Sequence, residues 1–196
     1  MPVKLFIFDM GGVLLKNFDV IPEMCRILNI SEKSFRKINK NRFKLLMEGR
    51  ITTHDFWQEF SENSGLSIKD EMISGLFKPE VDTEVERIII ELRKNFPVVC
   101  GTNTLKEHWD YLHERDMYQV FDRVYASHIM QTAKPEKKFF RMILEAERVL
   151  PEETVFIDDF LENVNAASSL GINSFLFSDT ASLDSDIKLL LGKVEV

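Results

Sequence analysis

Three aspartates follow short apolar runs of the sequence and could act together. Asp9 comes directly after the apolar run at residues 5–8, and Asp158 and Asp159 follow another at residues 154–157. Carboxylates that converge on one place repel each other, so they need a cation between them. Carboxylate oxygens are ligands that Mg²⁺ favours. The sequence therefore predicts a magnesium site, if the fold brings the two segments together.

Neutral and basic residues at other predicted strand and helix ends could bind a phosphoryl group. Such a group binds to backbone N–H groups, a hydroxyl and an ammonium. An ionised carboxylate such as Asp9 can attack it to form an aspartyl-phosphate. The residues that could supply the binding groups are Gly11, Gly12, Thr102, Asn103 and Lys134.

Each of these pieces also has a purely structural explanation. An Asp–Asp pair before a helix is often an N-cap, and Thr–Asn after a strand is often a turn. The sequence Lys134–Pro135 is a common helix entry, with a solvated lysine. Four such pieces in this order, each at the same predicted edge of a sheet, favour a functional site.

The elements that would position these residues alternate between strands and helices after residue 97. This alternation predicts βαβ units and a parallel, Rossmann-like sheet, so the fold class is α/β. The carboxyl ends of parallel strands share one edge, where ligands bind in open α/β sheets. Strands are predicted at 5–8, 97–101, 124–127, 154–157 and 174–177, and helices at 105–115, 136–149, 161–170 and 183–191.

A helical segment interrupts this pattern after the first strand. Helical spacing predicts helices at 21–28, 31–48 and 68–77, one that Thr52 or Thr53 caps, and one at 80–94. The predicted organisation is a core of residues 1–15 and 80–196 with an α-helical cap of residues 16–79. Helical spacing places Phe56, Trp57 and Phe60 in the core of that cap rather than in a pocket.

Composition narrows the class of partner. The net charge of −7 and the pI of about 5.2 argue against nucleic acid, which needs a basic face. They allow a small phosphorylated metabolite, which needs only local positive charge. No apolar stretch is long enough for a membrane span. The first apolar run contains Asp9, so a signal peptide is not predicted, and the two cysteines have no spacing typical of a disulfide framework or a zinc site. A cytoplasmic location is therefore expected, whereas the oligomeric state is not predicted.

The order Asp, Thr–Asn, Lys–Pro, Asp–Asp resembles the haloacid dehalogenase (HAD) superfamily of phosphatases over essentially the whole chain. The insertion after the first strand is similar to the small helical cap of its first subfamily. The segments FIFDMGGVLL, MEGRIT, SHIMQTAKP and VFIDDFLENVNAA look most like the branch that contains bacterial glucose-1-phosphate phosphatases. This resemblance implies a Mg²⁺-dependent phosphatase and makes a sugar phosphate one candidate substrate.

The resemblance also assigns roles around the metal. It implies that Asp9 is both the nucleophile and a Mg²⁺ ligand, and that the backbone carbonyl of Gly11 is a second ligand. It makes Asp159 a direct ligand and places Asp158 close by.

Around the phosphoryl group, the resemblance gives Thr102 and Asn103 the role of binding it. Lys134 would neutralise its charge and orient Asp9, and the cap would close over the site and select the substrate.

Two positions depart from the pattern of these phosphatases. Gly11 stands where most of them carry a second aspartate that protonates the leaving group and later activates water. Gln131 stands in place of a usual glycine. His108, on the helix after Thr102–Asn103, is a candidate substitute proton donor, although a packed histidine is the alternative. Gly11 keeps open two other functions, a haloacid dehalogenase and a non-catalytic binding protein.

Overall fold

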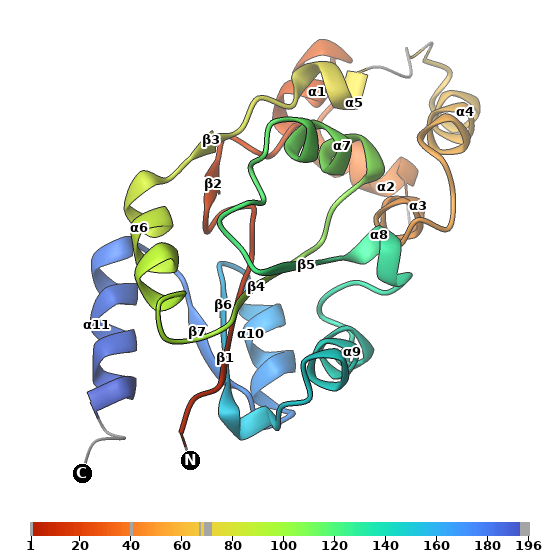
Figure 1. Ribbon diagram of the computed structural model, residues 1–196. Helices are drawn as coiled ribbons and strands as arrows, with labels where there is room; N and C mark the ends of the chain where they lie inside the picture. Colours follow the sequence, from red (N-terminus) through yellow and green to blue (C-terminus); the bar gives the residue numbers. More distant parts are fainter. Residues whose placement is uncertain (1, 40, 67, 69–71, 193–196) are drawn as a thin grey trace.

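A parallel sheet forms the centre of the computed structural model, which describes residues 2–39, 41–66, 68 and 72–192 (Figure 1). Its five strands lie in the order β5-β4-β1-β6-β7 and all pair in parallel. The central strand has no exposed side chain, which explains its continuous apolar sequence. The strands are β1 (Leu5–Phe8), β4 (Val98–Thr102), β5 (Arg123–Ala126), β6 (Thr154–Asp158) and β7 (Asn173–Leu176).

Helices cover both faces of the sheet (Figure 1). Because side chains alternate along a strand, Phe6 and Phe8 pack into one apolar cluster and Leu5 and Ile7 into another. The first cluster includes residues of α6 (Thr83–Leu92), α7 (Lys106–Glu114) and α11 (Thr180–Gly192). The second includes residues of α9 (Lys137–Glu147) and α10 (Leu161–Ser168). The predicted α/β class, with a helical insertion after the first strand, is confirmed.

The insertion is a separate group of helices above the sheet (Figure 1). Strands β2 (Leu15–Lys16) and β3 (Glu80–Val81) pair antiparallel at its base. Its longest helix begins at a capping box of Thr52 and Asp55 and buries Phe56, Trp57 and Phe60, which confirms their place in the core of the cap. Its helices are α1 (Ile21–Ile27), α2 (Glu32–Asn39), α3 (Arg42–Met47), α4 (Thr53–Ser64) and α5 (Met72–Leu76).

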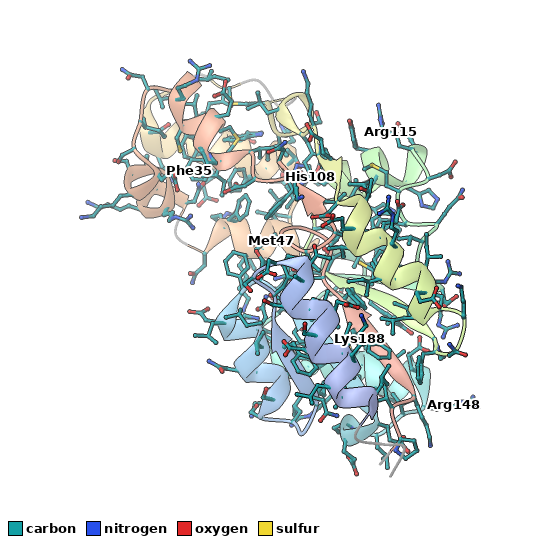
Figure 2. The ribbon with its side chains drawn as sticks, turned by 90° about the vertical axis from the view of Figure 1, so that its left-hand side faces the viewer. Phe35, Met47, His108, Arg115, Arg148 and Lys188 are labelled. Atoms are coloured by element: carbon teal, nitrogen blue, oxygen red, sulfur yellow. The ribbon has the colours of Figure 1, made fainter. Side chains whose placement is uncertain are left out.

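Polar contacts fasten the cap to the sheet domain. The Ser127 hydroxyl lies 2.6 Å from the carbonyl oxygen of Met47, to which it donates. Figure 2 shows Met47 at this junction. Lys44 of α3 pairs with Glu136 beside α9, and Lys16 pairs with Asp82 at 2.6 Å across the base of the cap. The cap is therefore anchored to the sheet domain at separate places.

The structure corrects several predicted elements. The helix predicted at 31–48 is two helices, α2 and α3, and residue 40 between them lies outside the described residues. Asparagines flank that break, and asparagine favours caps over helix interiors. The helix predicted at 80–94 begins only at Thr83, because β3 precedes it and Asp82 caps it.

Other differences are smaller. Residues 67 and 69–71 of the cap lie outside the described part, so the structure tests the helix predicted at 68–77 only over α5. Two short helices, α8 (Ser127–Met130) and η1 (Pro151–Glu153), were not predicted. Both cysteines are free and buried. No helix within the described ranges is long and apolar enough to cross a membrane.

Candidate active site

The polar residues at the strand ends meet at one edge of the sheet. Asp9 follows β1, Thr102 ends β4 and Asp158 ends β6, and these three strands are parallel neighbours. Lys134 comes from the segment between α8 and α9. Parallel pairing alone thus places the acids and the threonine side by side.

Lys134 lies between Asp9 and Asp158 and contacts both. Its ammonium nitrogen lies 2.8 Å from Oδ1 of Asp9 and 2.7 Å from Oδ2 of Asp158, and its side chain is fully buried. Burial opposes its charge, but the two carboxylates outweigh burial and raise the pKa of Lys134. Burial also raises the pKa of Asp9, an effect that Lys134 counteracts and the charge of Asp158 reinforces. The two carboxylates therefore share a single buried cation.

Asp158 is bonded through both carboxylate oxygens. Besides the contact of Oδ2 with Lys134, Oδ1 accepts the backbone N–H of Phe160 at 2.8 Å and the side-chain amide of Asn163 at 2.9 Å. Asp158 is therefore a fixed anchor for the lysine.

Asp159, in contrast, has an unpartnered oxygen. Its Oδ1 is buried and has no hydrogen-bond partner. Burial and the charge of Asp158 raise the pKa of Asp159 to about 6. One oxygen from each of Asp9, Asp158 and Asp159 lies within 4.8 Å of the others, an arrangement that could hold a metal ion. An oxygen-only donor set of this charge suits Mg²⁺.

The two glycines after Asp9 have different roles. Gly12 has φ +78°, and a Cβ there would lie 2.1 Å from Oδ2 of Asp159, so only glycine fits. Its N–H donates to the carbonyl of Leu15 at 2.9 Å, so the prediction that this N–H is free for an anion is wrong. Gly11 does not have a left-handed φ, but a Cβ there would lie 2.7 Å from the ring of Phe18.

Asn103 bonds to the backbone of Lys134. Its amide donates to the Lys134 carbonyl, and its carbonyl accepts the Lys134 N–H, both at 2.9 Å. This reciprocal pair fixes the loop that carries the lysine. Thr102 is buried at the end of β4.

Three contributors escaped sequence reasoning: Asn163, Ser127 and Phe18. Asn163 is a polar residue on the buried face of α10, a signal that could have indicated its bond to Asp158. Ser127 accepts the N–H of Thr104 at 3.0 Å, which ties the loop after β4 to α8. Phe18 had no signal, because its contact with Gly11 depends on the turn between them.

His108 is packed rather than placed among these residues. Its ring stacks on that of Phe77, with centroids 3.7 Å apart and planes 9° from parallel. Burial lowers its pKa to about 4, so the imidazole is neutral at pH 7. This favours the structural alternative over a role as proton donor.

Comparison with known proteins gives a consistent result. The chain is 25% identical to a sesquiterpene phosphatase of Aspergillus oryzae over 96% of this chain and 97% of the relative. It is 24% identical to a D-ribitol-5-phosphate phosphatase of Bacteroides thetaiotaomicron over 97% and 99% of the two chains. A HAD family enzyme of that bacterium, solved with magnesium and inorganic phosphate, superposes with a TM-score of 0.76 at 28% identity over 92% and 98% of the chains. A family model described as haloacid dehalogenase-like hydrolase matches residues 3–171. The chain belongs to the haloacid dehalogenase-like hydrolases.

Proposed function

We propose that this hydrolase is a Mg²⁺-dependent phosphatase of a small phosphorylated metabolite. The observation that carries the proposal is the buried group of Asp9, Lys134 and Asp158 beside the unpartnered oxygen of Asp159. A carboxylate nucleophile, a cation and a place for a metal ion are what transfer of a phosphoryl group requires.

In the proposed reaction Asp9 attacks phosphorus. Its Oδ1 accepts from Lys134 and from the backbone N–H of Met10 at 2.7 Å, which leaves Oδ2 to form the new bond. The bond from phosphorus to the leaving oxygen breaks, and water then hydrolyses the aspartyl-phosphate. Lys134 keeps Asp9 oriented and offsets negative charge. Bound Mg²⁺, held by Asp9, Asp159 and the Gly11 carbonyl with Asp158 close by, would offset charge on the phosphoryl oxygens.

The proposed binding groups for the phosphoryl oxygens are the Gly11 N–H, the Thr102 hydroxyl and Lys134. The contacts of Asn103 indicate that it acts mainly by holding Lys134. The proposed domain division is a core of residues 1–15 and 80–196 under a cap of residues 16–79, which would close over the site and select the substrate.

The relatives support the class of substrate. Their names specify D-ribitol 5-phosphate, phosphorylated carbohydrates and a sesquiterpene. We propose a small phosphorylated organic molecule, with sugar phosphates, including glucose 1-phosphate, among the first to test, and no nucleic acid or membrane as partner.

The test is phosphate release from 4-nitrophenyl phosphate with Mg²⁺ and with EDTA, followed by a panel of phosphorylated metabolites. Metal-dependent release is the expected result. Metal-independent halide release from a 2-haloacid would instead indicate a dehalogenase. The absence of both reactions in folded protein would overturn the proposal and favour a binding protein.

A further inference from the structure

The ring of Phe18 fills the space beside Gly11. A Cβ built on Gly11 would lie 2.7, 2.9 and 3.1 Å from three carbons of that ring. The first two distances are shorter than real side chains show. The backbone of Gly11 is not left-handed, so φ does not explain the glycine. The explanation is the ring, whereas the positive φ in this turn belongs to Gly12.

A turn in the chain between Gly11 and Phe18 places the ring beside Gly11. Leu14 and Leu15 both donate to the carbonyl of Met10, at 3.0 and 2.7 Å, and close a tight turn. Asn17 then takes a left-handed φ of 55°, which asparagine tolerates better than most residues. Phe18 is half-buried against the apolar cluster that β1 shares with the cap. Its ring is thus held by packing.

Phe18 borders the proposed site on the side of the cap. Gly11 lies two residues after Asp9, and Gly12 lies against Asp159. In phosphoryl transfer the attacking and leaving oxygens are roughly in line, so the leaving group points away from Asp9 and the sheet. Phe18 belongs to the segment between β2 and α1, which leads into the cap on that outer side.

We propose that Phe18 determines leaving-group specificity, an inference that rests on the proposed phosphatase function. The ring offers a flat apolar surface where a side chain at position 11 would stand. The favoured substrates are phosphate monoesters whose leaving oxygen is bonded to an unsaturated carbon, as in aryl and enol phosphates. Such groups are flat enough to stack on a ring.

Such leaving groups also need no acid. As the bond from Asp9 to phosphorus forms, the bond from phosphorus to the leaving oxygen breaks. The electron pair stays on that oxygen, which departs as a phenolate or enolate and takes its proton from water. Alkyl and polyol phosphates, whose alkoxides are strongly basic, are hydrolysed more slowly than aryl and enol phosphates.

The first test compares wild type with Phe18→Ala and Phe18→Leu on phenyl phosphates of graded acidity and on ribitol 5-phosphate. In wild type, kcat/KM rises steeply with the acidity of the leaving group. Both variants raise KM for the phenyl esters, about tenfold for alanine. Inhibition by inorganic phosphate, which has no leaving group, is unchanged. Leucine retains apolar volume, so it separates loss of the ring from loss of packing.

The second test introduces an acid. Gly11→Asp alone does not raise kcat, because the ring of Phe18 occupies the space that the new side chain needs. Gly11→Asp with Phe18→Ala raises kcat for ribitol 5-phosphate about 10²-fold or more over Phe18→Ala alone. Thermal melts establish that each variant is folded.

Two results would overturn the inference in an active enzyme. One is a wild type that hydrolyses ribitol 5-phosphate as fast as phenyl esters. The other is an unchanged KM for phenyl esters in both Phe18 variants. Loss of all phosphatase activity in wild type would instead refute the proposed function, so the two failures are distinguishable.

Discussion

The proposed site has a floor, which the strand ends of the sheet domain form, and a cap side, which faces the insertion. The two are built in opposite ways. On the floor, Asp9, Lys134 and Asp158 come from three segments, are all buried and are joined by ionic contacts of 2.7 and 2.8 Å. On the cap side, a Cβ at Gly11 would meet the ring of Phe18. At the junction with the sheet domain, a Cβ at Gly49 would meet the backbone of His128, and the Met47 carbonyl accepts from the Ser127 hydroxyl. In the proposed reaction the core would therefore supply charge, whereas the insertion would supply shape. Substitutions on the floor should stop the reaction, and those on the cap side should alter selectivity or closure.

Asp9→Asn should have the largest effect, the loss of measurable phosphate release. It should not unfold the protein, because Lys134 keeps Asp158 as its partner. Burial raises the pKa of Asp9 from the unfolded value of 3.8 to about 7, so the folded state loses stability as the pH rises between these two values. Asparagine does not ionise, so the variant does not lose this stability. Its melting temperature relative to wild type, measured without metal, should therefore rise from pH 4 to pH 8. Retained turnover would exclude Asp9 as nucleophile.

Lys134→Met should abolish activity and also destabilise the fold. It leaves two buried carboxylates without their cation, which costs about 3–5 kcal/mol. Lys106→Met is a matched control, because Lys106 pairs with Asp110 on the surface with 72% of its side chain exposed. That control should cost under about 1 kcal/mol. Urea unfolding measures both, and equal costs would contradict the assigned role of the buried cluster.

Mg²⁺ should raise the melting temperature, and Asp159→Ala should remove most of that shift. A ligand that binds only the folded state stabilises it by about 2.7 kcal/mol at 100 times its Kd. Asp184→Ala, at an exposed ion pair on α11, is the control and should keep the full shift. An equal shift in the Asp159 variant would place the metal elsewhere.

The sequence predicted the floor better than the cap side for a physical reason. An apolar run that ends in an aspartate is a local signal, and parallel pairing turns several such signals into one edge. The order of strands and helices and the convergence of Asp9, Thr102 and Asp158 at that edge follow from this rule.

What escaped prediction depends on tertiary contacts. The pairing of Asn103 with Lys134 joins residues 31 apart in the sequence, and the bond from Asn163 to Asp158 depends on how α10 is placed after the end of β6. The two-residue strands β2 and β3 are too short to show periodicity. The contact of Phe18 with Gly11 depends on the left-handed turn at Asn17.

The smallest effect should separate two glycines of the cap. Gly49 and Gly65 both have left-handed backbone, with φ +64° and +72°, so alanine at either is strained by about 1 kcal/mol. At Gly65 a Cβ would meet nothing within 4 Å, whereas at Gly49 it would lie 2.4 Å from the carbonyl oxygen of His128 in the sheet domain. Gly49→Ala must therefore also push the cap away from α8. We expect Gly65→Ala to lower stability by the strain alone and to leave KM unchanged. Gly49→Ala should lower the free energy of unfolding by more and should raise KM, because the cap can no longer pack closely against the sheet domain. Urea unfolding and steady-state kinetics of the two variants measure this difference. Equal losses of stability with an unchanged KM would show that the junction at Gly49 does not control how the cap closes.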